Sequence, residues 1–247
     1  MRAATVKLWA LHLLGDALIV ALFYIWLSIG EATAWQLIET ALLGLVLAGF
    51  SVWLQGTAFA HFQEPESALA ASFRSAWRRL LPLVVAALIA GVVYWFLSFL
   101  TDRAESPANK TASWLTLHLR RPVHPPMILS VFTWAIRLLE WVVAPVLLLP
   151  LAARVASEGW QGLAHGWFIR LRDWRYWLLS PVLLVLTLYV PWRLFHWVPY
   201  LGGLSGELAS FIARWLIAWL LFVAAWFATV AVASRRVLLN PGRAKQP

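Results

Sequence analysis

The chain has 247 residues, of which 62% are hydrophobic and 13% are charged, and its formal net charge is +9. Charged residues make up about a quarter of a typical soluble domain, so this composition excludes a soluble globular protein and indicates membrane-spanning segments instead. The sequence contains no Cys, which excludes disulfides, thiol catalysis and Cys-ligated metals.

The first hundred residues contain three apolar runs, at residues 8–29, 35–62 and 80–100. Each run is long enough for a membrane-spanning helix, which needs about 20 apolar residues. The first run follows basic residues and precedes small ones, which is also the outline of a cleaved signal peptide. It is longer than a signal peptide requires and contains His12 and Asp16, so we expect an uncleaved first helix.

Three further apolar runs follow, at residues 126–151, 177–197 and 208–234. They bring the expected number of spans to six and leave no segment for a soluble domain. The longest connection, 101–125, is polar at first and partly apolar later, so a short strand and a helical turn both fit it. We therefore predict an all-α polytopic fold, with residues 1–234 as a single six-helix transmembrane domain and 235–247 as a basic cytoplasmic tail.

Two segments between the spans, 64–79 and 157–174, carry apolar residues at helical spacing with arginines among them. This pattern predicts two amphipathic helices that lie in the cytoplasmic interface of the membrane. Ser157 is a suitable N-cap for the second helix. The residues that we expect to contact anionic lipid headgroups are Arg74, Arg78, Arg79, Arg170, Arg172 and Arg175.

The distribution of basic residues predicts the orientation of the chain. With the N-terminus inside, thirteen Lys and Arg residues flank the spans on the cytoplasmic side and five on the external side. Cytoplasmic loops carry such an excess of positive charge, so we expect both termini to be cytoplasmic. Arg is much commoner than Lys, which suggests a GC-rich bacterial genome and hence a multi-pass protein of a bacterial cytoplasmic membrane.

The order of elements in spans two and three recurs in spans four and five. Each pair of spans encloses one amphipathic segment, which closes with Trp77-Arg78 in the first pair and Trp174-Arg175 in the second. Both pairs run in the same direction, which predicts a parallel internal repeat. Chance similarity between apolar helices is the alternative.

The segment from Ser72 to Pro82 combines small residues, a basic amphipathic stretch and the start of a span. In this layout the chain resembles uncharacterised bacterial six-span membrane families, including membrane domains found joined to glycerophosphodiester phosphodiesterases. The resemblance covers most of the chain in layout and implies a six-span fold without implying an activity. The sequence itself contains no phosphodiesterase domain.

Ionisable residues within the spans are the first candidates for a functional site. Arg137 and Glu140 are three residues apart in the fourth span, so they share a predicted helix face and can pair. By its depth in the first span, Asp16 is a third member of this intramembrane polar cluster. Both a structural lock between helices and a path for protons or solutes explain such a cluster.

Glu39 and Arg214 form a second candidate pair, because both are expected at a similar depth below the outer face of the membrane. Glu39 belongs to the second span, where it corresponds in the repeat to Glu140, and Arg214 belongs to the sixth. Their pairing would join these two helices.

Two short segments resemble the motifs of rhomboid proteases: Gly203-Leu204-Ser205-Gly206 and Ala164-His165-Gly166. The order of Ser and His is the reverse of that in rhomboids, and the predicted topology places the two on opposite sides of the membrane. Nucleophile and base must come within hydrogen-bond reach, so we expect Ser205 to cap the sixth span instead. His124 and His196 lie on its predicted side and keep a serine hydrolase as a minor alternative. No zinc-binding motif or phosphate-binding loop occurs, and we expect no catalytic residue, metal or cofactor.

Three functional hypotheses follow. The first is a non-catalytic scaffold or accessory component that contacts anionic lipid. The second is a small transporter or channel that uses Asp16, Arg137 and Glu140, and the third is a hydrolase within the membrane or at its outer face. The expected partners are membrane lipids. Other membrane proteins or a second copy of the chain remain alternatives. Nucleic acid is not expected, because the basic residues lie beside apolar helices.

Overall fold

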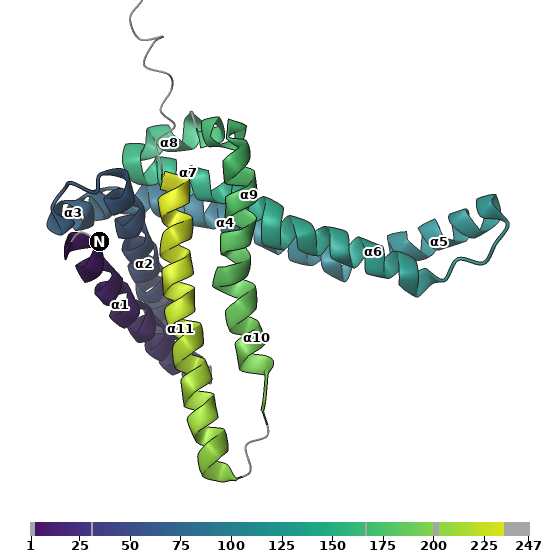
Figure 1. The fold of residues 1–247 in the computed structure, drawn as a ribbon, viewed down its shortest axis with the longest axis horizontal. Helices are drawn as coiled ribbons and strands as arrows, with labels where there is room; N and C mark the ends of the chain where they lie inside the picture. The colour runs from purple at the N-terminus through teal and green to yellow at the C-terminus, as the bar shows by residue number, and fades with distance from the viewer. Residues whose placement is uncertain (1–2, 31, 166, 200–202, 235–247) are drawn as a thin grey trace, which may run out of the picture. The chain divides into compact units, whose positions relative to one another are not determined.

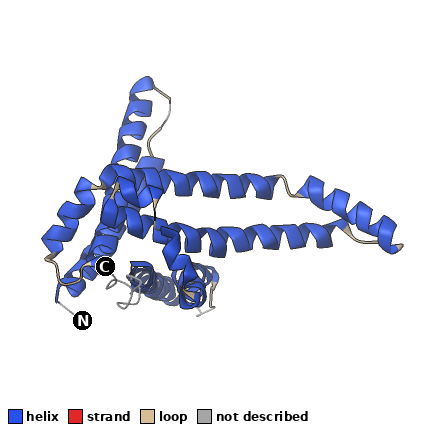
Figure 2. Cartoon of the chain, turned by 90° about the horizontal axis from the view of Figure 1, so that it is seen from above, coloured by secondary structure: helices blue, strands red, loops and turns tan. Residues whose placement is uncertain are grey.

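The computed structural model describes residues 3–30, 32–165, 167–199 and 203–234, without the side chains of 3, 4, 167, 169 and 170. Every regular element in these ranges is a helix, and they contain no strand (Figure 2). The all-α prediction is therefore confirmed. The predicted tail, 235–247, lies outside the described residues.

Among the described residues, six helices are long and apolar enough to span a membrane, as predicted for a multi-pass membrane protein. In chain order these are α1 (Ala3–Leu27), α2 (Ala34–Gln63), α4 (Leu80–Asp102), the continuous run α6 (Pro125–Leu138), η1 (Leu139–Val143) and α7 (Ala144–Glu158), the run α9 (Trp174–Leu184), η3 (Val185–Tyr189) and α10 (Val190–His196), and α11 (Leu204–Ser234). The shorter helices are α3 (Leu69–Arg78), α5 (Glu105–Leu119), α8 (Trp160–Ala164) and the 3₁₀-helix η2 (Trp167–Arg172).

The chain divides into two compact units, and the single transmembrane domain over residues 1–234 stays a prediction. Unit one comprises Met1–Ala86 and Leu149–Pro247, and unit two comprises Ala87–Leu148. In unit one, α1, α2 and α11 pack on one another, α3 packs on α2, and α11 also contacts α9 and α10 (Figure 1). In unit two, α5 packs on α6.

Close helix contacts in unit one depend on small residues. A Cβ on Gly15 of α1 would lie 2.8 Å from Leu54 Cδ2 of α2, and a Cβ on Gly56 would lie 2.6 Å from Leu83 Cδ1 of α4. Small residues let helix backbones approach closely where lipid provides no hydrophobic driving force. The beginning of α2 is fixed separately by a capping box between Thr33 and Gln36, which satisfies free backbone N–H groups.

Two of the spans contain a π-helical turn, and each turn ends two residues before a proline. Leu139–Val143 precedes Pro145, and Val185–Tyr189 precedes Pro191. Proline lacks an N–H and its ring clashes with the carbonyl four residues earlier. That carbonyl lies within the π turn in both spans, so the wider turn accommodates the proline without ending the helix.

Two sequence-based expectations about the connections are corrected. The segment 101–125 contains the 15-residue helix α5, where we expected a short strand or a helical turn. The segment 157–174 is not one continuous helix, because Gly159 adopts φ +62° after α7 and separates it from α8. Ser157 therefore caps nothing: it lies in the last turn of α7 and donates to the Arg154 carbonyl.

Candidate functional site

A partly buried polar network joins three spans of unit one. Gln55 of α2 lies at its centre, where its Nε2 donates to Asp16 Oδ1 of α1 at 3.4 Å and its Oε1 accepts from Trp226 Nε1 of α11 at 2.5 Å. His12 lies one helical turn before Asp16, with Nδ1 3.6 Å from Asp16 Oδ2. One amide thus uses a donor and an acceptor to connect two neighbouring helices to its own.

A second polar contact lies closer to the start of α1. Thr5 Oγ1 and His61 Nε2 of α2 are 3.2 Å apart. Aromatic rings separate this contact from the Gln55 network: His61 stands edge-on to Phe62, and Phe62 and His12 both stand edge-on to Phe227 of α11. The two imidazoles are therefore held between apolar rings inside the three-helix bundle.

Part of this network is unsatisfied. Among the described residues, both ring nitrogens of His12, Oδ2 of Asp16 and Nδ1 of His61 are buried without a hydrogen-bond partner. The side chain of His12 is fully buried, and its 3.6 Å approach to Asp16 is longer than a hydrogen bond. Burying a polar group without a hydrogen-bond partner costs about 1–3 kcal/mol of stability. Packing alone therefore does not explain the ionisable side chains of His12 and Asp16 at this position.

The candidate cluster Asp16, Arg137 and Glu140 is divided between the two units. Asp16 belongs to unit one and is 7% exposed, whereas Arg137 and Glu140 belong to unit two. Within the described residues, no ion pair joins Arg137 to Glu140. The π turn begins at Leu139, between the two residues, so the regular spacing on which their pairing was predicted is not kept. The pairing of Asp16 with either residue stays a prediction.

Arg137 is exposed and its guanidinium carbon lies 5.8 Å from the centre of the Trp134 ring. This distance allows a cation–π contact. Helical spacing also predicts that Ser130 and Ala144 share the polar face of Arg137 and Glu140. Ser130 is exposed and Ala144 is buried, so these residues do not form one uniformly buried face.

The second candidate pair, Glu39 and Arg214, is not formed in the described structure. Arg214 is 9% exposed and donates to the carbonyls of Ser210, Leu194 and Trp197. Two of these carbonyls end α10, where a cation satisfies unpaired acceptors and the helix dipole. Glu39 is exposed on α2. Arg214 therefore joins α11 to α10 in place of the predicted contact with α2.

The arginines predicted to contact lipid headgroups differ in whether other groups of the protein already bind them. Arg79 donates to Ser75 Oγ at 3.0 Å and to the Ala156 carbonyl at 2.5 Å, so it ties the end of α3 to α7 within unit one. The side chain of Arg170 lies outside the described residues. The exposed members of the set are Arg74, Arg78, Arg172 and Arg175.

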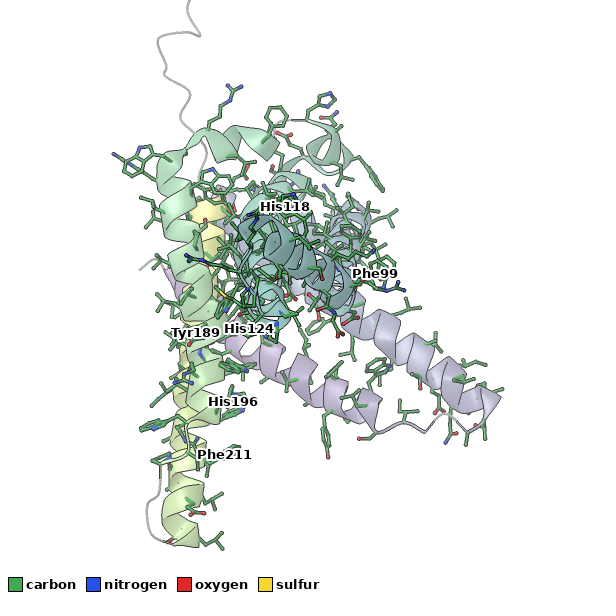
Figure 3. The ribbon with its side chains drawn as sticks, turned by 90° about the vertical axis from the view of Figure 1, so that its right-hand side faces the viewer. Phe99, His118, His124, Tyr189, His196 and Phe211 are labelled. Atoms are coloured by element: carbon green, nitrogen blue, oxygen red, sulfur yellow. The ribbon has the colours of Figure 1, made fainter. Side chains whose placement is uncertain are left out.

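The arrangement of Ser and His residues supports no hydrolase centre in the part of the chain described. Ser205 lies in the first turn of α11, whereas α8, which precedes His165, lies beside the other end of that 31-residue helix (Figure 1). His196 lies on α10 beside α11 (Figure 3), and its Nδ1 is 2.8 Å from the Trp192 carbonyl. No hydrogen bond joins Ser205 to a described His, and no group of three His, Asp or Glu side chains among the described residues could hold a metal ion.

Sequence reasoning overlooked Trp226 and His61, and it did not recognise Gln55 as the centre of a network. One signal was present. Trp is enriched at the two membrane interfaces, and Trp226 lies well inside the sixth apolar run. An indole N–H buried there needs a partner, which directs attention to polar side chains at the same depth. No protein-family model, curated protein or solved structure matches this chain.

Proposed function

We propose that this chain is a non-catalytic integral scaffold or accessory component of a bacterial cytoplasmic membrane, which contacts anionic lipid. The observation that carries this proposal is the position of Gln55, which connects α1 to α11 through α2. Polar groups that bridge helices in this way stabilise a bundle in lipid. The excess of basic residues flanking one side of the spans supports cytoplasmic termini.

The surroundings of the Gln55 network favour a scaffold over a conduit. An open groove of about 420 Å³ on unit one is lined by apolar residues and one glycine, and none of the polar residues of the Gln55 network lines it. A solute path requires polar groups that converge on accessible space. In unit one the polar groups are instead packed between helices.

A small transporter or channel is the second candidate, and one observation favours it. His12 and Asp16 are ionisable, buried in a span and incompletely hydrogen-bonded. Ionisable groups at such positions often form proton relays. Under this hypothesis Asp16, with Arg137 and Glu140, would form the path of the transported protons or solutes.

Flux measurements in proteoliposomes distinguish the two candidates. We expect the wild-type protein to leave an imposed proton gradient as stable as in protein-free vesicles of the same lipid. Proton flux that appears with the wild type, disappears in Asp16→Asn and persists in the control Asp102→Asn would overturn the scaffold proposal. Asp102 suits the control because it is an exposed carboxylate at the end of α4.

A further inference from the structure

An open apolar groove lies on the surface of unit one between α1, α2 and α3. Leu11, Leu14 and Leu18 line it from α1, Phe50 and Trp53 from α2, and Phe73 from α3. Its volume of about 420 Å³ falls within the range of small-ligand sites. Leu14, the most exposed of these leucines, is 75% exposed, so no described part of the chain fills the groove.

The packing of the helices creates the groove and leaves the indole donor of Trp53 hydrogen-bonded within the protein. Gly15 contributes no side chain, and Leu54 occupies the space where its Cβ would be. The indole N–H of Trp53 donates to the Phe73 carbonyl at 3.3 Å, and the two rings lie 5.1 Å apart. This contact ties α3 to α2 and satisfies the indole donor of the groove, so the occupant must be apolar.

The groove is short enough to lie within one leaflet of the membrane. Leu11 and Leu18 are seven residues apart, or roughly 10 Å along the helix axis, whereas one leaflet of hydrocarbon is about 15 Å thick. A partner helix would need an apolar face that runs across the full membrane. An acyl chain of a lipid stays within one leaflet, so a groove of roughly 10 Å contacts most of its length.

Two basic residues neighbour groove-lining residues along α1 and α3. Lys7 precedes Leu11 by four residues, so it continues the Leu11–Leu14–Leu18 face of α1 toward the start of the helix. Arg74 follows Phe73 on α3, and both cations are exposed. Glu64 and Glu66, in the turn before α3, each interact with another group of the protein. Lys7, four residues before Leu11, and Arg74, next to Phe73, thus supply exposed positive charge beside the groove-lining residues.

We propose that this groove binds one acyl chain of an anionic membrane phospholipid, whose phosphate headgroup contacts Lys7 and Arg74. The inference rests on the proposed function and makes it specific, because it replaces general contact with anionic lipid by one defined site. A cation near the membrane surface attracts anionic lipid, and the apolar groove fixes the position of the chain below it.

Photochemical labelling in membranes tests the position of the chain. The full-length protein is reconstituted with phosphatidylglycerol that carries a diazirine in one acyl chain, and the labelled peptides are sequenced. We expect labelling to concentrate at residues 11–18 and 50–53 and to fall about tenfold in Leu14→Trp, a loss equivalent to 1.4 kcal/mol. Leu45→Trp is the matched control, because Leu45 is 70% exposed on α2 and does not line the groove.

Native mass spectrometry tests the headgroup. The purified protein is titrated with phosphatidylglycerol and with phosphatidylcholine of identical chains. We expect tighter retention of phosphatidylglycerol, weakened roughly fivefold by each of Lys7→Gln and Arg74→Gln, while the exposed Arg193→Gln leaves it unchanged. Equal retention of the two lipids overturns the headgroup assignment. Labelling outside the groove, or a crosslink from the groove to a second protein chain, overturns the site.

The two proposals fail in different ways. If no lipid is held in the groove while the proteoliposomes remain tight to protons, the lipid site is wrong and the scaffold proposal stands. If Asp16-dependent proton flux is observed, the scaffold proposal is wrong whichever lipid the groove holds. Thermal denaturation of each variant, compared with wild type, excludes unfolding as the cause of a lost lipid.

Discussion

The two arginines within the spans have opposite surroundings. In unit one, Arg214 is 9% exposed and donates to three backbone carbonyls. In unit two, Arg137 is exposed and has the face of Trp134 as its described contact. In the sequence both are single cations within an apolar run. Arg214 lies beside the end of another helix, whose free carbonyls it binds, and among the described residues Arg137 binds no helix end. A neighbouring helix end, and not the position of the arginine in its apolar run, therefore makes the arginine a tie between helices.

The largest expected effect is that of Arg214→Leu. It leaves the carbonyls that end α10 without a donor, and the loss of hydrogen bonds to a charged group should cost about 3 kcal/mol of unfolding free energy. Equilibrium denaturation in detergent measures this change. The control is Arg193→Leu, an exposed arginine of α10, and an equal loss in both variants would contradict the structural role of Arg214.

The next effect should come from Gln55→Leu, which tests whether a neutral group in unit one holds helices as Arg214 does. The substitution leaves the Trp226 indole and the Asp16 carboxylate without their Gln55 partner, which should cost about 2 kcal/mol. The same denaturation experiment applies, with the exposed Gln161→Leu as its control. Unchanged stability would mean that the network does not fasten α1 and α11.

Arg137→Leu should change the stability of the folded protein by less than about 0.5 kcal/mol, as expected for an exposed side chain without a strong partner. A loss comparable to that of Arg214→Leu would show that Arg137 is paired, and would revive the predicted cluster with Asp16 and Glu140. Combining Arg137→Leu with Asp16→Asn in a double-mutant cycle then measures the coupling directly.

The smallest effect should be that of Glu39→Gln. Because Glu39 is exposed while Arg214 binds carbonyls, the coupling energy between the two should lie within about 0.3–0.5 kcal/mol of zero, as for independent sites. A double-mutant cycle of Glu39→Gln with Arg214→Leu provides this value. A larger coupling would restore the ion pair predicted from depth alone.

The depth of a residue in the membrane is a poor guide to its ion-pair partner, because depth does not say toward which neighbouring helix the side chain points. Glu39 and Arg214 were matched by their distance from the outer face, yet the arginine turns to the carbonyls of α10. Arg137 and Glu140 were matched by helical spacing, and a π turn between them changes that spacing. The prolines that accompany both π turns are visible in the sequence, but the form of the turn is not.

The connections were harder to predict than the spans, because short helices depend on local contacts. In the segment 101–125 the apolar residues show no clear period, so α5 was missed. In the segment 157–174 the apolar period is clear, but the positive φ of Gly159 ends α7 and interrupts the pattern. A period predicts which face is apolar, and it does not predict where the backbone turns.

The sequence by itself determined that the chain is all-α, with six helices long and apolar enough to span a membrane, since these features follow from the length and composition of uninterrupted apolar runs. The tertiary structure decided which polar groups meet: Gln55 with Asp16 and Trp226, and Arg214 with the end of α10. It also decided where the apolar surface forms a groove between α1, α2 and α3. The physical reason is that crossing the membrane is a property of each segment alone, whereas pairing depends on how each helix is rotated against its neighbours.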